Sequence, residues 1–170
     1  MRRSHSFLLI AVLGTLLGMA LDAHGPIGAR LYPPAAGGVE PAGLQTPFVM
    51  GSVLVQAIGI GVGLALLPNA QAFIDTLARM AGGRRGIAVL SLLSLEWILV
   101  SWIPHVGLHQ HVSPSDFWAL GSIEWGFHAT LVGAGLILVR FLYVANAAGS
   151  HTETRTDPMQ RTPTARIQGE

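Results

Sequence analysis

The sequence contains no cysteine and no lysine, and it has few charged residues of either sign. The absence of cysteine excludes disulfides, thiolate metal sites, iron–sulfur clusters and cysteine nucleophiles. Only 11% of the 170 residues are charged and 51% are hydrophobic, whereas an average soluble domain has about 25% charged residues. The net charge is +1, and no basic patch is interleaved with aromatic residues, which argues against a nucleic-acid partner. The composition therefore predicts a membrane protein.

Familiar catalytic motifs are missing as well. The sequence has no G-x-S-x-G nucleophile elbow, no phosphate-binding loop and no dinucleotide fingerprint. The glycines of the second apolar run lie in the middle of that run, where they serve helix packing. Whether the protein is an enzyme is therefore left open.

Four apolar runs are each close to the length of about 20 residues that crosses about 30 Å of hydrocarbon as a helix. They cover residues 7–22, 48–67, 87–103 and 117–139, and the last can extend to 147. Pro68 and Pro104 end the second and third runs. We predict an all-α integral membrane protein with a bundle of four transmembrane helices within residues 1–148. A disordered cytoplasmic tail, residues 149–170, follows.

The first run has two interpretations. It is short and follows two arginines, as in a signal peptide that is cleaved, but it can equally be a retained helix. Gly14 and Gly18 form a small-xxx-small pattern that favours a retained, packed helix. The segment 23–46 is rich in glycine and proline, so no regular element is expected there.

The segment 69–83 is predicted to be a short amphipathic helix at the membrane surface, with a solvated connecting helix as the alternative. Asn69 can cap its start, and a Gly-Gly pair can end it. Asp75 and Arg79 are spaced as an i,i+4 ion pair.

Arginine positions predict the orientation of the helices. With four spans, all the arginines except Arg30 fall on one side, which the positive-inside rule assigns to the cytoplasm. Both termini are then cytoplasmic in the plasma (inner) membrane.

Ionisable residues gather in or beside the outer half of three of the runs. Because such groups are costly in hydrocarbon, an intramembrane ionisable residue indicates a functional site. The residues are Asp22, His24, Glu96, His105, His109, Glu124 and His128.

Three of these residues form the predicted core of the site. Glu96 and Glu124 each lie about seven residues, or roughly 10 Å, from the outer end of their runs, so we expect them at one depth. His128 shares a helix face with Glu124. On a continuous helix Glu96 and His105 are about 180° apart, so both can face inward only if Pro104 breaks the helix. Asp22 and His109 are interpreted as ordinary boundary residues.

Imidazole and carboxylate together suit a transition metal ion such as Cu, Fe, Zn or Mn. We predict Glu124 and His128 as the central ligands, with Glu96 facing them and His24 and His105 completing the set. A b-type haem fits less well, because only His128 lies near mid-membrane. The expected role is in redox chemistry, metal handling or as an accessory protein.

Two alternatives remain open at the level of sequence. Glu96, Glu124 and His128 could form a metal-free proton relay or a proton-coupled transport site. The chain could instead be a scaffold or accessory subunit, with the lipid bilayer around it and a membrane protein or a second copy docked on its glycine-rich faces.

Overall fold

The computed structural model describes residues 2–33, 35, 43 and 45–153, and these contain helices and no strand. The elements are α1 (Arg2–Leu21), α2 (Gly28–Leu31), α3 (Gln45–Leu66), the 3-10 turn η1 (Leu67–Asn69), α4 (Ala70–Met80), α5 (Arg85–Val100), α6 (Trp102–His111) and α7 (Phe117–Glu153). The predicted all-helical class is confirmed.

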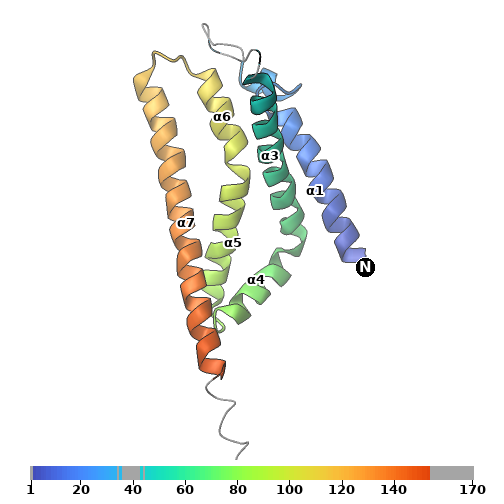
Figure 1. Ribbon diagram of the computed structural model, residues 1–170, viewed down its shortest axis with the longest axis vertical. Coiled ribbons are helices and arrows are strands. Elements are labelled where there is room, and N and C mark those ends of the chain that lie inside the picture. Colours follow the sequence, from blue (N-terminus) through green and yellow to red (C-terminus); the bar gives the residue numbers. More distant parts are fainter. Residues whose placement is uncertain (1, 34, 36–42, 44, 154–170) are drawn as a thin grey trace, which may run out of the picture.

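The long helices stand side by side in a row (Figure 1). Helix α1 packs on α3, α3 on α5, and α5 on α7. Helices α1 and α7 are at opposite sides of the row, so the arrangement is open. Both end helices therefore have a face that no other long helix covers.

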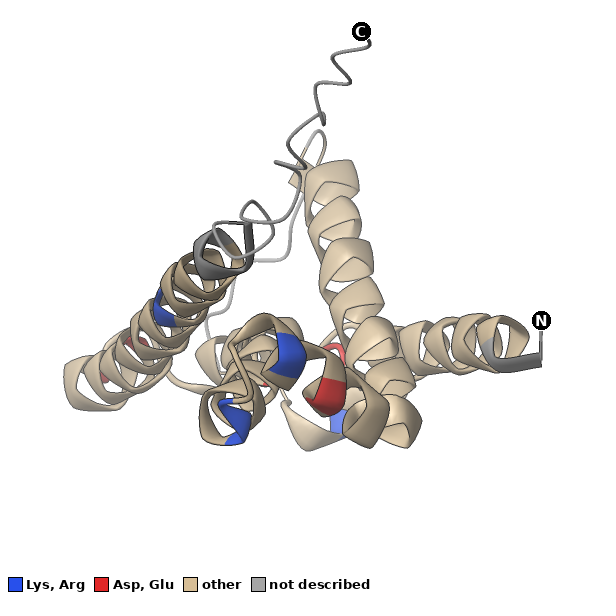
Figure 2. Ribbon diagram, turned by 90° about the horizontal axis from the view of Figure 1, so that it is seen from below, with Lys and Arg blue, Asp and Glu red and all other residues tan. Residues whose placement is uncertain are grey.

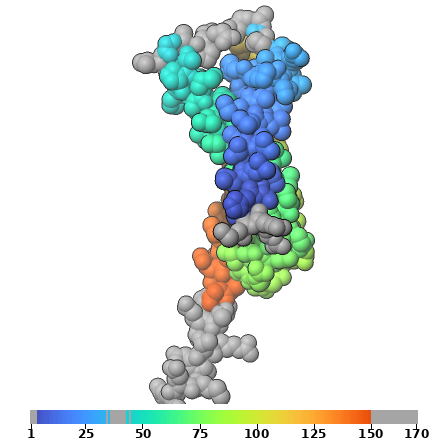
Figure 3. Space-filling view, turned by 90° about the vertical axis from the view of Figure 1, so that its right-hand side faces the viewer, coloured from blue at the N-terminus to red at the C-terminus, as the bar shows by residue number. Residues whose placement is uncertain are grey.

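Three helical stretches are long and apolar enough to cross a membrane, and there are four if α5 and α6 count as one bent span. The outer surface of the row is correspondingly apolar. Val55 of α3 is 69% exposed and Leu136 of α7 is 64% exposed. Such exposed side chains are costly in water and suit contact with lipid chains. Figure 3 shows α1 in blue along one side, with the start of α3 in cyan beside it.

Small residues allow α1 and α3 to touch closely. A Cβ added at Gly14 would lie 2.8 Å from the Cα of Gly61, and one added at Gly18 would lie 2.9 Å from the Cα of Ala57. The two backbones therefore meet directly, as small-xxx-small faces do between membrane helices. The prediction that the first helix is packed through Gly14 and Gly18 is confirmed.

Helix α3 uses a second set of glycines toward α5. A Cβ at Gly59 would lie 2.6 Å from the carbonyl oxygen of Leu99, and one at Gly63 would lie 2.7 Å from Oε2 of Glu96. The predicted contact face of Gly59 and Gly63 is thus confirmed. Helix α5 of the same chain covers this face.

The connection after α3 is helical as predicted, with differences in its polar contacts. Asn69 stands at the N-cap of α4 but its side chain makes no capping bond. Gly82 and Gly83 end the helix with positive φ values of 63° and 85°, where side chains other than glycine are disfavoured. Asp75 lies 3.6 Å from Arg85, whereas Arg79 donates to Thr76, so the predicted Asp75–Arg79 pair is wrong.

Two segments predicted as irregular contain helix. Helix α2 forms one turn in the glycine- and proline-rich segment, and α7 continues through residues 149–153 of the predicted tail. The rest of that tail, residues 154–170, and residues 34, 36–42 and 44 lie outside the described part of the chain.

The third apolar run does not end at Pro104. Helices α5 and α6 follow one another with a bend of 43° at Ser101, and Pro104 is the third residue of α6. Proline cannot donate to the carbonyl four residues earlier, which is Val100, and its ring crowds that carbonyl. The helix therefore bends before the proline and then resumes, because the first turn of a helix needs no amide donors.

Along the helix axes the molecule has two ends, and arginines gather at the end where α4 and α5 meet the C-terminal half of α7 (Figure 2). Arg79, Arg84 and Arg85 are in or beside that corner, whereas Arg30 is in α2 at the opposite end. The two ends of the molecule along the helix axes thus differ in their number of these arginines, as the sequence predicted.

Replacing Gly61 with leucine is expected to separate α1 from α3, since a Cβ there would lie 2.3 Å from the carbonyl oxygen of Ala11. We expect a loss of about 2 kcal/mol or more, the usual scale of overpacking. Thermal unfolding in detergent measures it. Gly135→Leu is the matched control, because a Cβ at Gly135 has nothing within 4 Å. Equal melting of the two variants would contradict the packing described.

Candidate metal centre

Four side chains from two helices form a compact cluster at the opposite end of the helix axes from α4. His105 and His109 are one turn apart on α6, and Glu124 and His128 are one turn apart on α7. Residues four apart share a helix face. Because α6 and α7 run antiparallel, His109 lies opposite Glu124 and His105 lies opposite His128.

The contacts within the cluster are short. Nε2 of His109 lies 3.0 Å from Oε1 of Glu124, and Nδ1 of His128 lies 2.6 Å from Oε2 of the same carboxylate. Nε2 of His109 also lies 3.1 Å from Nε2 of His105. The rings of His105 and His128 meet edge to face with their centroids 5.2 Å apart. Glu124 thus contacts two imidazoles, and the third, His105, contacts both of these.

Aromatic packing fixes His105. Its ring stacks on Phe127 at 4.7 Å between centroids, and Phe127 stacks in turn on Trp97 at 5.8 Å. The Trp97 indole donates to Thr130 over 3.1 Å, which ties α5 to α7. His105 is 7% exposed, so this imidazole is held in one orientation by its surroundings.

The donor atoms suit a transition metal ion. One ligating atom each from His105, Glu124 and His128 lies within 4.8 Å of the others. In a tetrahedral site with bonds of about 2.0–2.2 Å, ligating atoms are about 3.3–3.6 Å apart, so the side chains would have to draw closer by up to roughly 1.5 Å to hold an ion. Two imidazoles and a carboxylate match the preferences of Zn, Cu, Fe or Mn. This group of residues could therefore hold a metal.

The outer side of the cluster is open. The side chains of Glu124 and His128 are 46% and 54% exposed. A groove of about 510 Å³ beside them is lined by Glu124, Trp125, His128, Ala129 and Val132. An ion here would have coordination positions free toward the groove.

Glu96 lies elsewhere. Its carboxylate faces Gly63 of α3, near the end of that helix, and its Oε1 is buried without a hydrogen-bond partner among the described residues. The neighbouring Trp97 bonds Thr130, six residues along α7 from Glu124 and roughly 9 Å deeper at 1.5 Å per residue. The expectation that both carboxylates share one depth is wrong, because α6 moves the end of the third span well past Pro104.

His24 is also apart from the cluster. It follows α1 and pairs with Asp22, whose Oδ1 lies 3.1 Å from Nδ1 of His24 and accepts the His24 backbone amide at 3.0 Å. Asp22 is 1% exposed. Of the five predicted ligands, the structure brings together His105, Glu124 and His128, and it does not bring Glu96 or His24 to them.

His109 was interpreted as a boundary residue, yet it touches both Glu124 and His105. The signal was present in the sequence as the i,i+4 spacing of His105 and His109, which equals that of Glu124 and His128. This spacing does not enter the prediction, because the third run is predicted to end at Pro104.

No model of a known protein family matches the chain, and no characterised protein or solved structure is significantly similar to it. The geometry of the cluster is therefore the main guide to function.

Replacing Pro104 with alanine is expected to straighten the joint between α5 and α6, because an amide donor for the Val100 carbonyl is restored. The end of α6 should then move away from α7 by roughly 10 Å, the displacement of a 10-residue helix at 1.5 Å per residue turned through 43°. Spin labels on Gln110→Cys and Val139→Cys can report it, since the chain has no native cysteine. An unchanged distance distribution would show that something other than Pro104 imposes the bend.

Proposed function

We propose that the protein is an integral membrane protein that binds a transition metal ion through His105, Glu124 and His128, with His109 as a fourth donor or as a partner of Glu124. The observation that carries this proposal is the convergence of ligating atoms from α6 and α7 within 4.8 Å. Carboxylate and imidazole in hydrocarbon are costly, and ion binding offsets that cost.

The surroundings support a membrane setting. The helices carry exposed apolar side chains along their length, and arginines lie at the end of α4. With the arginine end toward the cytoplasm of the inner membrane, both termini are cytoplasmic and the metal centre lies near the outer face. Helix α4, with its apolar and polar faces, then rests at the inner surface.

The open side of the cluster favours an ion that reacts or exchanges. Structural zinc sites are closed by four protein ligands, whereas catalytic and transfer sites keep a position open. Here Glu124 and His128 are half-exposed and border a groove. A redox or metal-handling role fits this arrangement better than a purely structural ion.

Elemental analysis of the detergent-purified protein tests the proposal. We expect up to one ion per chain, and Glu124→Ala and His128→Ala should each lower the affinity for Zn²⁺ or Cu²⁺ at least tenfold, because each removes a direct ligand. His111→Ala is the matched control. That imidazole is in α6 too, but it faces Pro33 and not the cluster.

Two further variants sharpen the result. Glu96→Gln and His24→Ala should leave metal affinity unchanged, since neither residue approaches the cluster. A metal-free wild-type protein that also fails to take up added ions, or equal affinity in the Glu124 and His111 variants, would refute the proposal.

A second function, a metal-free proton relay, has an observation in its favour. His105, His109, Glu124 and His128 are joined by contacts of 2.6–3.1 Å, which is a chain of groups able to pass a proton. Glu96 lies deeper, in the apolar interior between α3 and α5. Transport would use the same residues without an ion.

Proton flux into liposomes distinguishes the two functions. A relay requires that Glu124→Gln lower the flux at least tenfold, because glutamine cannot gain and lose a proton there. Under the metal proposal the wild-type protein carries no such flux above protein-free liposomes. Metal-independent flux that disappears in Glu124→Gln would favour the relay.

A further inference from the structure

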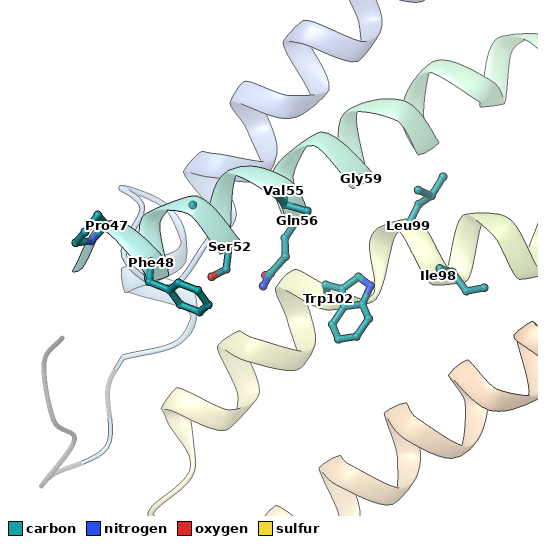
Figure 4. A pocket seen from close by; sticks show the side chains of 10 residues that line it. Pro47, Phe48, Ser52, Val55, Gln56, Gly59, Ile98, Leu99 and Trp102 are labelled. Atoms are coloured by element: carbon teal, nitrogen blue, oxygen red, sulfur yellow. The ribbon is translucent and has the colours of Figure 1, made fainter. Parts of the chain in front are cut away.

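A second groove lies between α3 and the joint of α5 with α6, on the other side of that joint from the metal centre (Figure 4). It has a volume of about 720 Å³, within the range of roughly 300–1,000 Å³ that small-molecule sites occupy. Its walls are mostly apolar and include Phe48, Val55, Ile98, Leu99 and Trp102. Phe48 and Val55 are 82% and 69% exposed, so the groove opens sideways toward the surroundings of the helices.

Two polar side chains in this groove have no partner. The amide of Gln56 extends from α3 toward α6, and the indole of Trp102 lines the same space (Figure 4). Neither makes a hydrogen bond with any described residue, and Oε1 of Gln56 is buried. Ser52, also in the groove, is satisfied by the Val49 carbonyl at 2.7 Å. An unpaired polar group in an apolar setting costs free energy that a bound ligand can recover.

The chemistry of these groups points to a carbonyl ligand. The indole N–H can only donate, and the nitrogen of the Gln56 amide, unlike its buried Oε1, reaches the groove surface and also donates. Gln56 can therefore pair with a carbonyl or, once the ligand is reduced, with a hydroxyl. The rings of Phe48 and Trp102 offer apolar surface for a flat ring.

The depth of Gln56 in the membrane distinguishes two possible sources of the carbonyl, a phospholipid ester and a quinone. Gln56 is the twelfth of the 22 residues of α3, roughly 16 Å from its start and near the middle of a hydrocarbon core of about 30 Å. The ester carbonyls of phospholipids are attached to headgroups at the surface and do not reach that depth. A lipid-soluble quinone does.

We propose that this groove binds the head ring of a membrane quinone, with Gln56 and Trp102 donating to its carbonyl oxygens. The Trp102 ring lies 6.2 Å from the ring of His105, so one indole separates the bound quinone from the metal centre. Binding requires no metal, because the groove contains none of the cluster residues.

Photolabelling of the full chain tests the proposal. The protein is placed in phosphatidylcholine nanodiscs, treated with EDTA and irradiated with an azido-ubiquinone carrying a decyl tail. Label is expected within residues 47–59 and 98–102. Excess decylubiquinone should abolish it, whereas dodecylbenzene, which has a ring and a tail but no carbonyl, should not compete.

Two variants probe the groove. Gly51→Leu fills it without a clash, because a Cβ there has nothing within 4 Å, and should lower labelling at least tenfold. Gly133→Leu is the matched control, equally uncrowded but on α7 and outside the groove, and should label as the wild type does. Gln56→Leu should weaken competition by decylubiquinone about tenfold, as expected for one lost hydrogen bond.

Three outcomes would overturn the proposal. They are label spread over the outer face of α7 with no enrichment in the groove, unchanged labelling of Gly51→Leu together with unchanged competition in Gln56→Leu, and equal competition by dodecylbenzene. Because the protein is stripped of metal throughout, failure here leaves the metal proposal unaffected, and loss of metal binding leaves this one standing.

Discussion

The missing amide hydrogen of Pro104 is the constraint on which the candidate metal centre depends. Without it the Val100 carbonyl lacks the amide donor four residues later, and the helix turns through 43° before continuing as α6. The turn brings His105 and His109 against Glu124 and His128 of α7. The aromatic stack of Trp97, Phe127 and His105 then fills the angle between α5 and α7. A straight helix would carry the imidazoles away from the carboxylate.

Two kinds of contact hold the row of helices together, and they do different work. On the side of α1, glycines let backbones touch, so the helices pack at a short separation with little freedom. On the side of α7, large rings separate α5 from its neighbour and leave room for polar groups. Helix α3 uses glycines on both of its faces and therefore forms the rigid centre against which α5 is placed.

Much of the fold could be predicted because membrane helices are recognised in a sequence by the length and apolarity of their runs. Pro68 is predicted to end the second run, and helix α3 ends two residues before it, at Leu66. The joint at Pro104 was not predictable in the same way, since proline can either end a helix or bend it, and only neighbouring helices decide between the two. Because the helix continues past Pro104 as α6, Glu96 lies deeper than expected and His109 joins the cluster. The pairing of α6 with α7 is a tertiary feature, and local spacing alone could not reveal it.

The open row has a kinetic consequence for whatever Glu124 and His128 hold. In a closed bundle a central ion leaves only when helices part, and its residence time follows the slow collective motions of the fold. Here the ligands are on the outermost helix and one side is uncovered. An ion held there could leave His105 once Glu124 and His128 rotate outward, without any parting of helices, so the lifetime of the bound state would be set by ligand exchange and by whatever molecule lies against α7.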